Sequence, residues 1–196
     1  MSILHRFSRN ALSYFTATPA KPHTAFSKSD QRILLTAAIL FQVLYLLVIP
    51  LGFEGDAAMY VNYAKSFIGA EGAGGAYYRA PGFPFFLVLS GQLLFVSFIP
   101  TVAFHAVMGV LSPLLFYRTL APVSRWAAFI AAAAFILSTT PFFGAKLMLA
   151  EHLFAFFIVA GFYGFSRYYF SHDVRFLYLS LFCFFSATFT RWEANP

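Results

Sequence analysis

Long apolar runs alternate with short polar stretches along most of this 196-residue chain. A helix that crosses the hydrocarbon core of a bilayer needs about 20 predominantly apolar residues, and several runs approach that length. The pattern therefore predicts an all-α, polytopic transmembrane helical bundle and excludes a soluble globular domain. We expect five spans, at residues 33–51, 101–117, 126–143, 148–165 and 176–190.

The segment before the first span, residues 1–32, is polar and basic. Residues 3–15 place apolar side chains on one helical face and Arg6 and Arg9 on the other, as in a helix that lies on an anionic membrane surface. A disordered basic tail explains this pattern equally well. The segment lacks the apolar core and cleavage site of a signal peptide. We interpret it as a cytoplasmic tail, followed by one transmembrane module at residues 33–196.

A loop of mixed polarity, residues 52–100, separates the first two spans. The helical spacing of its aromatic residues predicts a juxtamembrane helix over Asp56–Ile68, which a glycine-rich stretch then ends. A further apolar run, residues 83–99, is bounded by prolines. The topology depends on this run, because every later span is inverted if it crosses the bilayer.

The charges decide between the two topologies. The chain is 60% hydrophobic and 10% charged, with a net charge of +6, and its Lys and Arg are expected to collect on the cytoplasmic side. If residues 83–99 do not cross, nine Lys and Arg lie on the side of the tail and four on the other. We therefore prefer five spans and residues 52–100 as an outer loop. The acids on the outer face are then Glu54, Asp56, Glu71, Glu151 and Glu193.

Two clusters in the outer loop carry candidate chemistry. Glu54 and Asp56 lie beside Tyr60 at the predicted start of the juxtamembrane helix; an ionised carboxylate there can act as a general base, hold a divalent metal, or simply cap the helix. Tyr78 and Arg79 precede a Pro-Gly turn. Arg79 there can pair with a phosphate or snorkel to the membrane surface in an aromatic belt.

A third cluster surrounds Glu151, which lies inside an apolar run. A carboxylate within a membrane segment indicates a functional site, although one at the outer end of a span can also be satisfied by water. His152 follows it, but neighbouring helical residues point apart, so no metal ligands are assigned. His105 is interpreted as a packed or water-facing histidine, and Cys183 as a small buried apolar residue. Arg191 and Glu193 end the last span on the same face.

The order of these motifs resembles that of the GT-C membrane glycosyltransferases, and most closely the protein-mannosyltransferase and aminoarabinose-transferase type of glycosyltransferase family 39. The resemblance begins at Asp-x-x-x-Tyr, residues 56–60, and continues with Tyr-x-x-Pro-Gly-x-Pro, residues 78–84. The stretch Pro141–Phe154 is similar to the family's second acidic motif, and Arg191-Trp192-Glu193 to a motif that is often Arg-Pro-Glu.

The resemblance implies a polyprenyl-phosphate-linked sugar donor and transfer to a lipid, glycan or protein acceptor on the non-cytoplasmic face of the cell membrane. Asp56 would be the catalytic base or orient the acceptor, and Glu151 would be a second carboxylate for the acceptor or a divalent metal. Arg79 would stabilise the departing phosphate, although some relatives have Lys-Pro-Pro where this chain has Arg79-Ala80-Pro81. The remaining expected substrate contacts are Glu54, Tyr60, Tyr78, Arg191 and Glu193.

Three further expectations complete the interpretation. Family members continue for several hundred residues, so a chain that stops at Asn195-Pro196 is expected to be an amino-terminal portion.

A transporter or lipid-flipping subunit is the main alternative function, and it predicts charged residues near the bilayer midplane. A non-catalytic membrane scaffold is the third. No feature of the sequence indicates nucleic-acid binding, and no nucleotide loop, zinc motif or hydrolase elbow is present.

Overall fold

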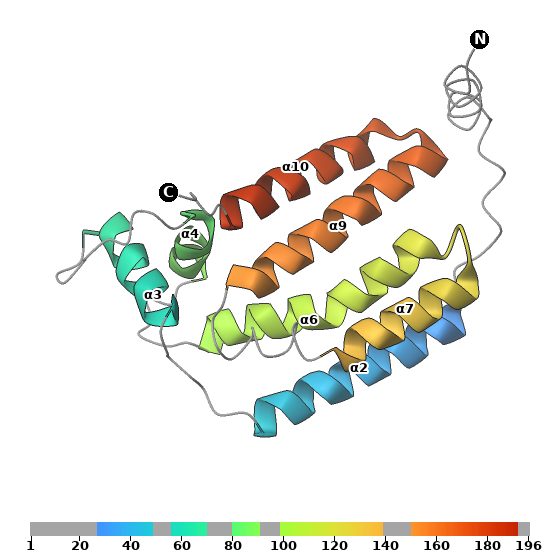
Figure 1. The fold of residues 1–196 in the computed structure, drawn as a ribbon, viewed down its shortest axis with the longest axis horizontal. Helices are drawn as coiled ribbons and strands as arrows, with labels where there is room; N and C mark the ends of the chain where they lie inside the picture. The colour runs from blue at the N-terminus through green and yellow to red at the C-terminus, as the bar shows by residue number, and fades with distance from the viewer. Residues whose placement is uncertain (1–26, 49–55, 70–79, 91–98, 139–149, 192–196) are drawn as a thin grey trace, which may run out of the picture.

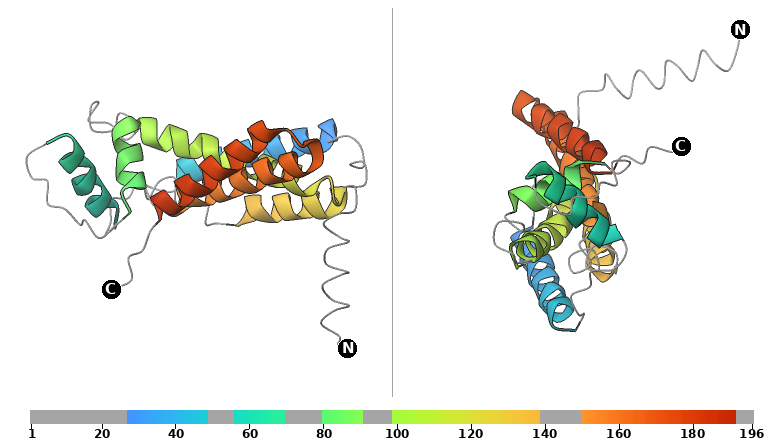
Figure 2. Two further views of the ribbon diagram at one scale, coloured as in Figure 1. Left: turned by 90° about the horizontal axis from the view of Figure 1, so that it is seen from above. Right: turned by 90° about the vertical axis from the view of Figure 1, so that its left-hand side faces the viewer.

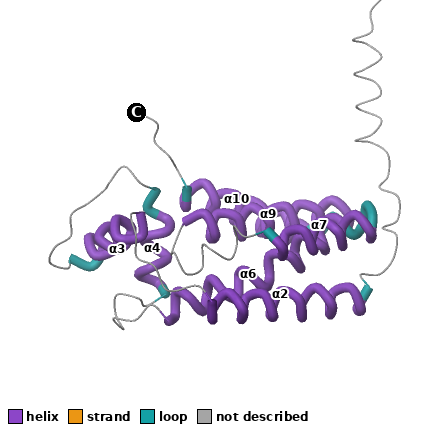
Figure 3. Tube along the Cα trace, turned by 60° about the horizontal axis from the view of Figure 1, so that its bottom comes forward, coloured by secondary structure: helices purple, strands orange, loops and turns teal. Residues whose placement is uncertain are grey.

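The computed structural model describes residues 27–48, 56–69, 80–90, 99–138 and 150–191. Within these ranges the regular structure is entirely helical, with no strand (Figure 3), which confirms the all-α fold class. The helices are α2 (Lys28–Val48), α3 (Asp56–Phe67), α4 (Gly82–Leu89), α6 (Ile99–Leu120), α7 (Arg125–Leu137), α9 (Ala150–Ser171) and α10 (Val174–Thr190).

Five of these helices form the body of the molecule and lie side by side (Figure 1). From one edge to the other the order is α10, α9 and α6, and α7 and α2 then pack against α6 and against each other. Each successive long helix runs in the opposite direction to the one before it. The two short helices, α3 and α4, lie together at one end of the bundle, at a steep angle to the long helices (Figure 2).

The surface of the bundle is suited to lipid. The helices α2, α6 and α9 are long and apolar enough to cross a membrane, and α7 and α10 are shorter apolar helices. Large apolar side chains face outward on several of them: Leu47 is 79% exposed, Ile130 65% and Phe182 63%. Soluble proteins rarely expose apolar surface on this scale, whereas lipid tails match it. The described part of the chain is therefore an all-α membrane bundle.

Cations gather at the end of the bundle that lies away from α3 and α4. This basic end contains the start of α2, the end of α6, the start of α7, the end of α9 and the start of α10 (Figure 1). Six of the eight Lys and Arg residues in the described ranges belong to it: Lys28, Arg32, Arg118, Arg125, Arg167 and Arg175. We call the other end, where α3 and α4 lie, the opposite end.

One buried carboxylate ties three helices together at the basic end. Asp30 of α2 accepts hydrogen bonds from the guanidinium of Arg125, at 2.7 and 2.8 Å, and from the hydroxyl of Tyr117, at 3.0 Å. The next residue, Gln31, accepts two more from Arg118 through its side-chain oxygen. Charge-assisted bonds of this kind are stronger than neutral ones, so they fix how the starts of α2 and α7 meet the end of α6.

Small residues allow α9 and α10 to pack closely. A Cβ added to Gly164 would meet the carbonyl oxygen of Phe176 and the amide nitrogen of Ser180 at 3.0 Å. One turn earlier, the hydroxyl of Ser180 donates to the carbonyl oxygen of Gly161 at 2.9 Å. Membrane helices commonly associate through small residues and side-chain hydrogen bonds of this type. Because α9 and α10 run in opposite directions, this close packing places the start of α9 and the end of α10 at the same end of the molecule.

The helix bounds differ from the expected spans by a few residues at most ends, and the expected end of the 126–143 span lies outside the described residues. α6 extends over Ile99–Leu120 and α9 over Ala150–Ser171, longer than the apolar runs that predicted them. In the run at 83–99, α4 ends at Leu89 and Ser90 is its C-cap. Residues 91–98 lie outside the described ranges, so the topology in which this run does not cross stays a prediction. The predicted juxtamembrane helix is α3, and Gly69, which follows it, has a φ of +66°. The predicted amphipathic helix lies outside the described residues.

Candidate active site

The opposite end of the bundle has its own apolar core, built from three helices that are distant in sequence. Its buried members are Tyr60 and Ala64 from α3, Phe83 and Leu87 from α4, and Ala150 and Leu153 from α9. The ring centres of Tyr60 and Phe83 are 5.0 Å apart in an edge-to-face arrangement. The helices α3 and α4 are therefore packed onto the bundle next to the start of α9.

Two further contacts fix α4 in this position. At its end, the hydroxyls of Ser90 and Thr101 are 2.8 Å apart in a buried hydrogen bond that joins α4 to the first turn of α6. At its start, a Cβ on Gly82 would lie 2.6 Å from the carbonyl oxygen of Phe189. Only glycine allows the start of α4 to approach the last turn of α10 this closely. The Pro-Gly motif therefore has a packing role that the sequence did not reveal.

The first candidate carboxylate, Asp56, is the first residue of α3, which agrees with its predicted position at a helix start. Tyr60, four residues later, is 7% exposed and packs against Phe83. Its aromatic ring is therefore a core element, and it anchors the helix that Asp56 begins. A direct contact of Tyr60 with a substrate stays a prediction.

The second candidate carboxylate, Glu151, is the second residue of α9 and is half-buried. Its Oε2 atom is buried, with no hydrogen-bond partner among the described residues. A carboxylate in the first turn of a helix is stabilised by the helix dipole and by free backbone N–H groups. Glu151 thus supplies an acceptor at the opposite end of the bundle that no other described residue satisfies.

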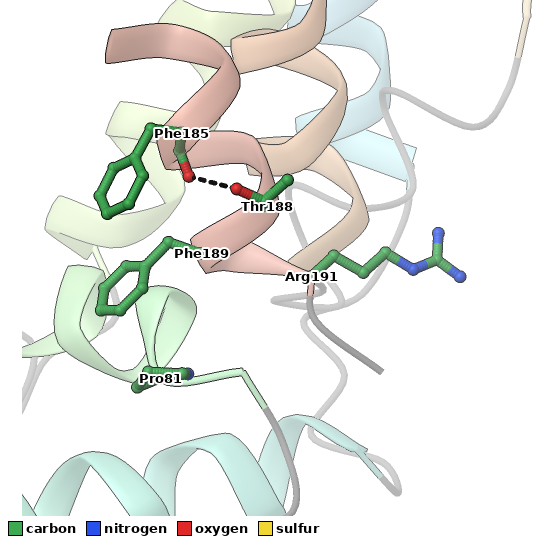
Figure 4. A pocket seen from close by; sticks show the side chains of 5 residues that line it. All are labelled: Pro81, Phe185, Thr188, Phe189 and Arg191. Carbon is green, nitrogen blue, oxygen red and sulfur yellow. Dashed lines mark hydrogen bonds between the residues drawn. The ribbon is translucent and has the colours of Figure 1, made fainter. Parts of the chain in front are cut away.

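An apolar pocket of about 390 Å³ lies between the start of α4 and the end of α10. It is lined by Pro81, Phe185, Thr188, Phe189 and Arg191 (Figure 4). The rings of Phe185 and Phe189 stand on one side of it, and the Arg191 guanidinium extends away from them. The guanidinium carbon is 5.9 Å from the ring centre of Phe154 on α9. The pocket thus combines aromatic walls with one cation at its edge.

The structure places three predicted site residues at the opposite end with Asp56: Tyr60, Glu151 and Arg191. Four others lie outside the described residues, so their positions stay predictions. These are Glu54, Tyr78, Arg79 and Glu193. Arg79 directly precedes the described segment that begins at Ala80, and Glu193 follows Arg191 by two residues.

Several residues of this region were missed by the sequence analysis. The aromatic residues Phe185 and Phe189 belonged to an unremarkable apolar run, and their spacing of four residues is the only signal that they share a face. Gln42 was also overlooked, although a lone amide in the first apolar run is uncommon in a membrane helix. In the described ranges, no group of three or more His, Cys, Asp or Glu side chains is arranged to hold a metal ion.

Comparison with known proteins gives one match. The family model for dolichyl-phosphate-mannose-protein mannosyltransferases matches residues 64–190, which are 127 of the 196 residues. The matched region begins within α3 and ends with α10. It contains Glu151 and the pocket residues Pro81 and Phe189. Asp56 precedes the matched region, and Arg191 follows it. Searches of curated proteins and of solved structures found no match. The chain belongs to the dolichyl-phosphate-mannose-protein mannosyltransferase family.

Proposed function

We propose that this chain is a multi-pass membrane glycosyltransferase that moves a sugar from a polyprenyl-phosphate donor to an acceptor on the non-cytoplasmic face. The family supports the general activity and the polyprenyl-phosphate donor. The observation that carries the proposal is the division of the bundle into two ends. Arginines and lysines gather at one end, whereas Asp56, Glu151 and Arg191 lie at the other, with α3, α4 and the apolar pocket.

The orientation follows from the basic end. Lys and Arg in short connections and at the adjoining helix ends are retained on the cytoplasmic side. The α6–α7 and α9–α10 connections of this chain are both short, and arginines flank each of them. The opposite end, with the candidate site, then lies on the non-cytoplasmic face. Crossing by α2, α6, α7, α9 and α10 would bring five helix ends to each face.

The distribution of charge favours surface chemistry over transport. Among the described residues, no Asp, Glu, Lys or Arg lies in the middle of a long helix, since all of them fall near helix ends. A transporter places such groups near the bilayer midplane, at breaks in its helices. Carboxylates at helix starts beside an apolar pocket are instead what a transferase needs when it takes a lipid donor from the membrane.

Each site residue has a proposed role that fits its position. Asp56 accepts the proton of the acceptor hydroxyl, which makes that oxygen a better nucleophile toward the sugar carbon. Glu151 binds the acceptor through its unsatisfied oxygen. The pocket beside Phe185 and Phe189 receives the first part of the polyprenyl chain, and Arg79 and Arg191 stabilise the negative charge that develops on the departing phosphate. No step here requires a metal, and we assign none to these residues.

The test is transfer activity of the purified full chain with a polyprenyl-phosphate sugar and a range of acceptors. Asp56→Asn and Glu151→Gln keep the shape of the side chain and remove its charge, and we expect each to lower the rate about 100-fold or more. Asp173→Asn, at the basic end, is the matched control and should keep full activity. Near-normal transfer by Asp56→Asn with unchanged membrane insertion would refute the proposed site.

A further inference from the structure

A cluster of buried polar side chains lies below the candidate active site, within the bundle, and the proposed transfer reaction does not use it. Gln42 on α2 is 3% exposed and His152 on α9 is 2% exposed. Their four side-chain nitrogen and oxygen atoms have no hydrogen-bond partner among the described residues. His105 on α6, fully buried, is the third member. We call these three residues the polar cluster.

A glycine brings the cluster together. A Cβ on Gly109 would lie 2.7 Å from the side-chain oxygen of Gln42 and 3.6 Å from Cε1 of His152. Gln42 and His152 therefore reach the same notch on α6 from opposite sides. His105 lies one helical turn before Gly109 on the same face, and its ring centre is 5.1 Å from that of His152. Side chains from three helices thus converge on one point.

The backbone of α6 offers an additional oxygen beside the cluster. Pro113 lies four residues after Gly109 within α6, and proline has no N–H to donate to the carbonyl of the residue four positions earlier. The carbonyl oxygen of Gly109 is therefore left without its usual helical donor. A buried polar group that lacks a partner in hydrocarbon costs several kcal/mol, so this arrangement favours a ligand.

The chemistry of the cluster indicates the kind of ligand. Imidazole nitrogen is a preferred ligand of Zn²⁺, with Zn–N distances of about 2.0–2.1 Å in a tetrahedral site. Two imidazoles on one tetrahedral ion then have ring centres about 5 Å apart, which matches the separation of His105 and His152. The side-chain oxygen of Gln42 supplies an oxygen ligand. A hard ion such as Mg²⁺ requires more oxygen and retains its waters, so this set discriminates against it.

We propose that His105, His152 and Gln42 form a binding site for a transition-metal ion of the Zn²⁺ type. The ion joins α2, α6 and α9 just below the end of the bundle where Glu151 lies. Phe83 and Phe86 of α4 stack on the His105 ring, with centres 5.8 and 5.6 Å away. The site therefore also supports the helix that lines the candidate active site. Its role is structural, and it does not depend on the proposed transferase function.

The test measures metal content of the full chain, purified in detergent through a tag that contains no histidine. After incubation with Zn²⁺ and removal of free ion, we expect about one tightly bound zinc per chain. The double variant His105→Ala/His152→Ala should lose it. The matched control replaces the other three histidines, His5, His23 and His172, and should retain it. Equal zinc in the two variants, or none in the unsubstituted chain, would overturn the proposal.

A second measurement needs no variant that removes a ligand. Zn²⁺ should raise the midpoint of thermal unfolding of the unsubstituted chain after treatment with a chelator, and Mg²⁺ at the same concentration should not. The substitution Gly109→Ala fills the notch with a methyl group and should abolish the Zn²⁺ effect. If Mg²⁺ stabilises the chain as much as Zn²⁺ does, or Gly109→Ala still responds, the polar cluster is not a metal site.

Discussion

Gly82 at the start of α4 lies directly against the backbone of Phe189 at the end of α10, where an added Cβ would be 2.6 Å from the Phe189 carbonyl oxygen. This contact joins the first residue of the short helix α4 to the last turn of the last described helix. Pro81, which precedes Gly82, and Phe189 both line the apolar pocket. The width of the pocket is therefore set by a backbone contact that only glycine permits.

We expect Gly82→Ala to lower activity and stability together. The methyl group would have to displace rigid backbone, and such overpacking costs about 1–3 kcal/mol. Thermal unfolding and the KM for the polyprenyl donor are the measurements. The control is Gly69→Asn, because a Cβ there meets nothing within 4 Å and Asn tolerates the positive φ of that residue. If Gly82→Ala changes the unfolding temperature and the KM no more than Gly69→Asn does, the contact between Gly82 and Phe189 does not shape the pocket.

Replacement of Arg191 tests the edge of the same pocket. Arg191→Ala should raise the KM for the donor about 10- to 100-fold, as expected for loss of a charged hydrogen bond to phosphate worth about 1.5–3 kcal/mol. Arg175→Ala removes an exposed arginine from the basic end and should leave the KM unchanged. Arg191→Lys should recover only part of the loss, because a point charge lacks the planar fork of the guanidinium. Equal effects of Arg191→Ala and Arg175→Ala would exclude a donor contact.

At the basic end, Asp30→Asn should destabilise the bundle without affecting the chemistry. The substitution weakens the bonds from Arg125 and Tyr117 to a side chain that is nearly buried, whereas Arg125 itself is half-exposed and can be hydrated. The expected loss is therefore modest, about 1–2 kcal/mol. Asp173→Asn, an exposed cap at the same end, is the control and should change little, since Asn is also a good cap. A loss of activity at unchanged stability would contradict this assignment.

The contact between α9 and α10 gives a further stability prediction. Gly164→Leu places a large side chain where even a Cβ meets the backbone of Phe176 and Ser180 at 3.0 Å, so we expect it to separate the two helices. Unfolding in detergent, measured by the loss of helical signal on heating, should occur at a clearly lower temperature. Phe162→Leu, on an exposed position of α9, is the control for a change of apolar volume. Comparable midpoints for the two variants would show that α9 and α10 do not depend on close approach.

The helical class and the approximate position of each long helix followed from the long apolar runs, because a helix satisfies all of its own backbone groups within lipid. The juxtamembrane helix α3 was also predicted, since Tyr60 and Tyr63 recur at helical spacing and both are buried. The expected roles of Asp56 and Glu151 came from the resemblance to a known family and not from the spacing of the residues. Spacing alone left each of them as either a helix cap or a functional group.

The residues that depend on packing between distant helices were not predictable. Gly82 looked like part of a turn, but its constraint comes from Phe189, more than a hundred residues later in the chain. Helix geometry argued against pairing His152 with Glu151, because neighbouring helical residues point apart. The neighbour of His152 is instead His105, on another helix. Such contacts are set by how α4, α6, α9 and α10 meet, and local sequence contains no information about that register.

The proposed site requires that Asp56 and Glu151 share one side of the membrane. In a Cys183→Ser background, single cysteines at positions 56, 120 and 151 can be labelled in intact cells with a reagent that does not cross the membrane. We predict that cysteines at 56 and 151 react from outside and that the one at 120, beside the basic end, reacts only after the cells are opened. Labelling of 151 together with 120 rather than with 56 would contradict the proposed site.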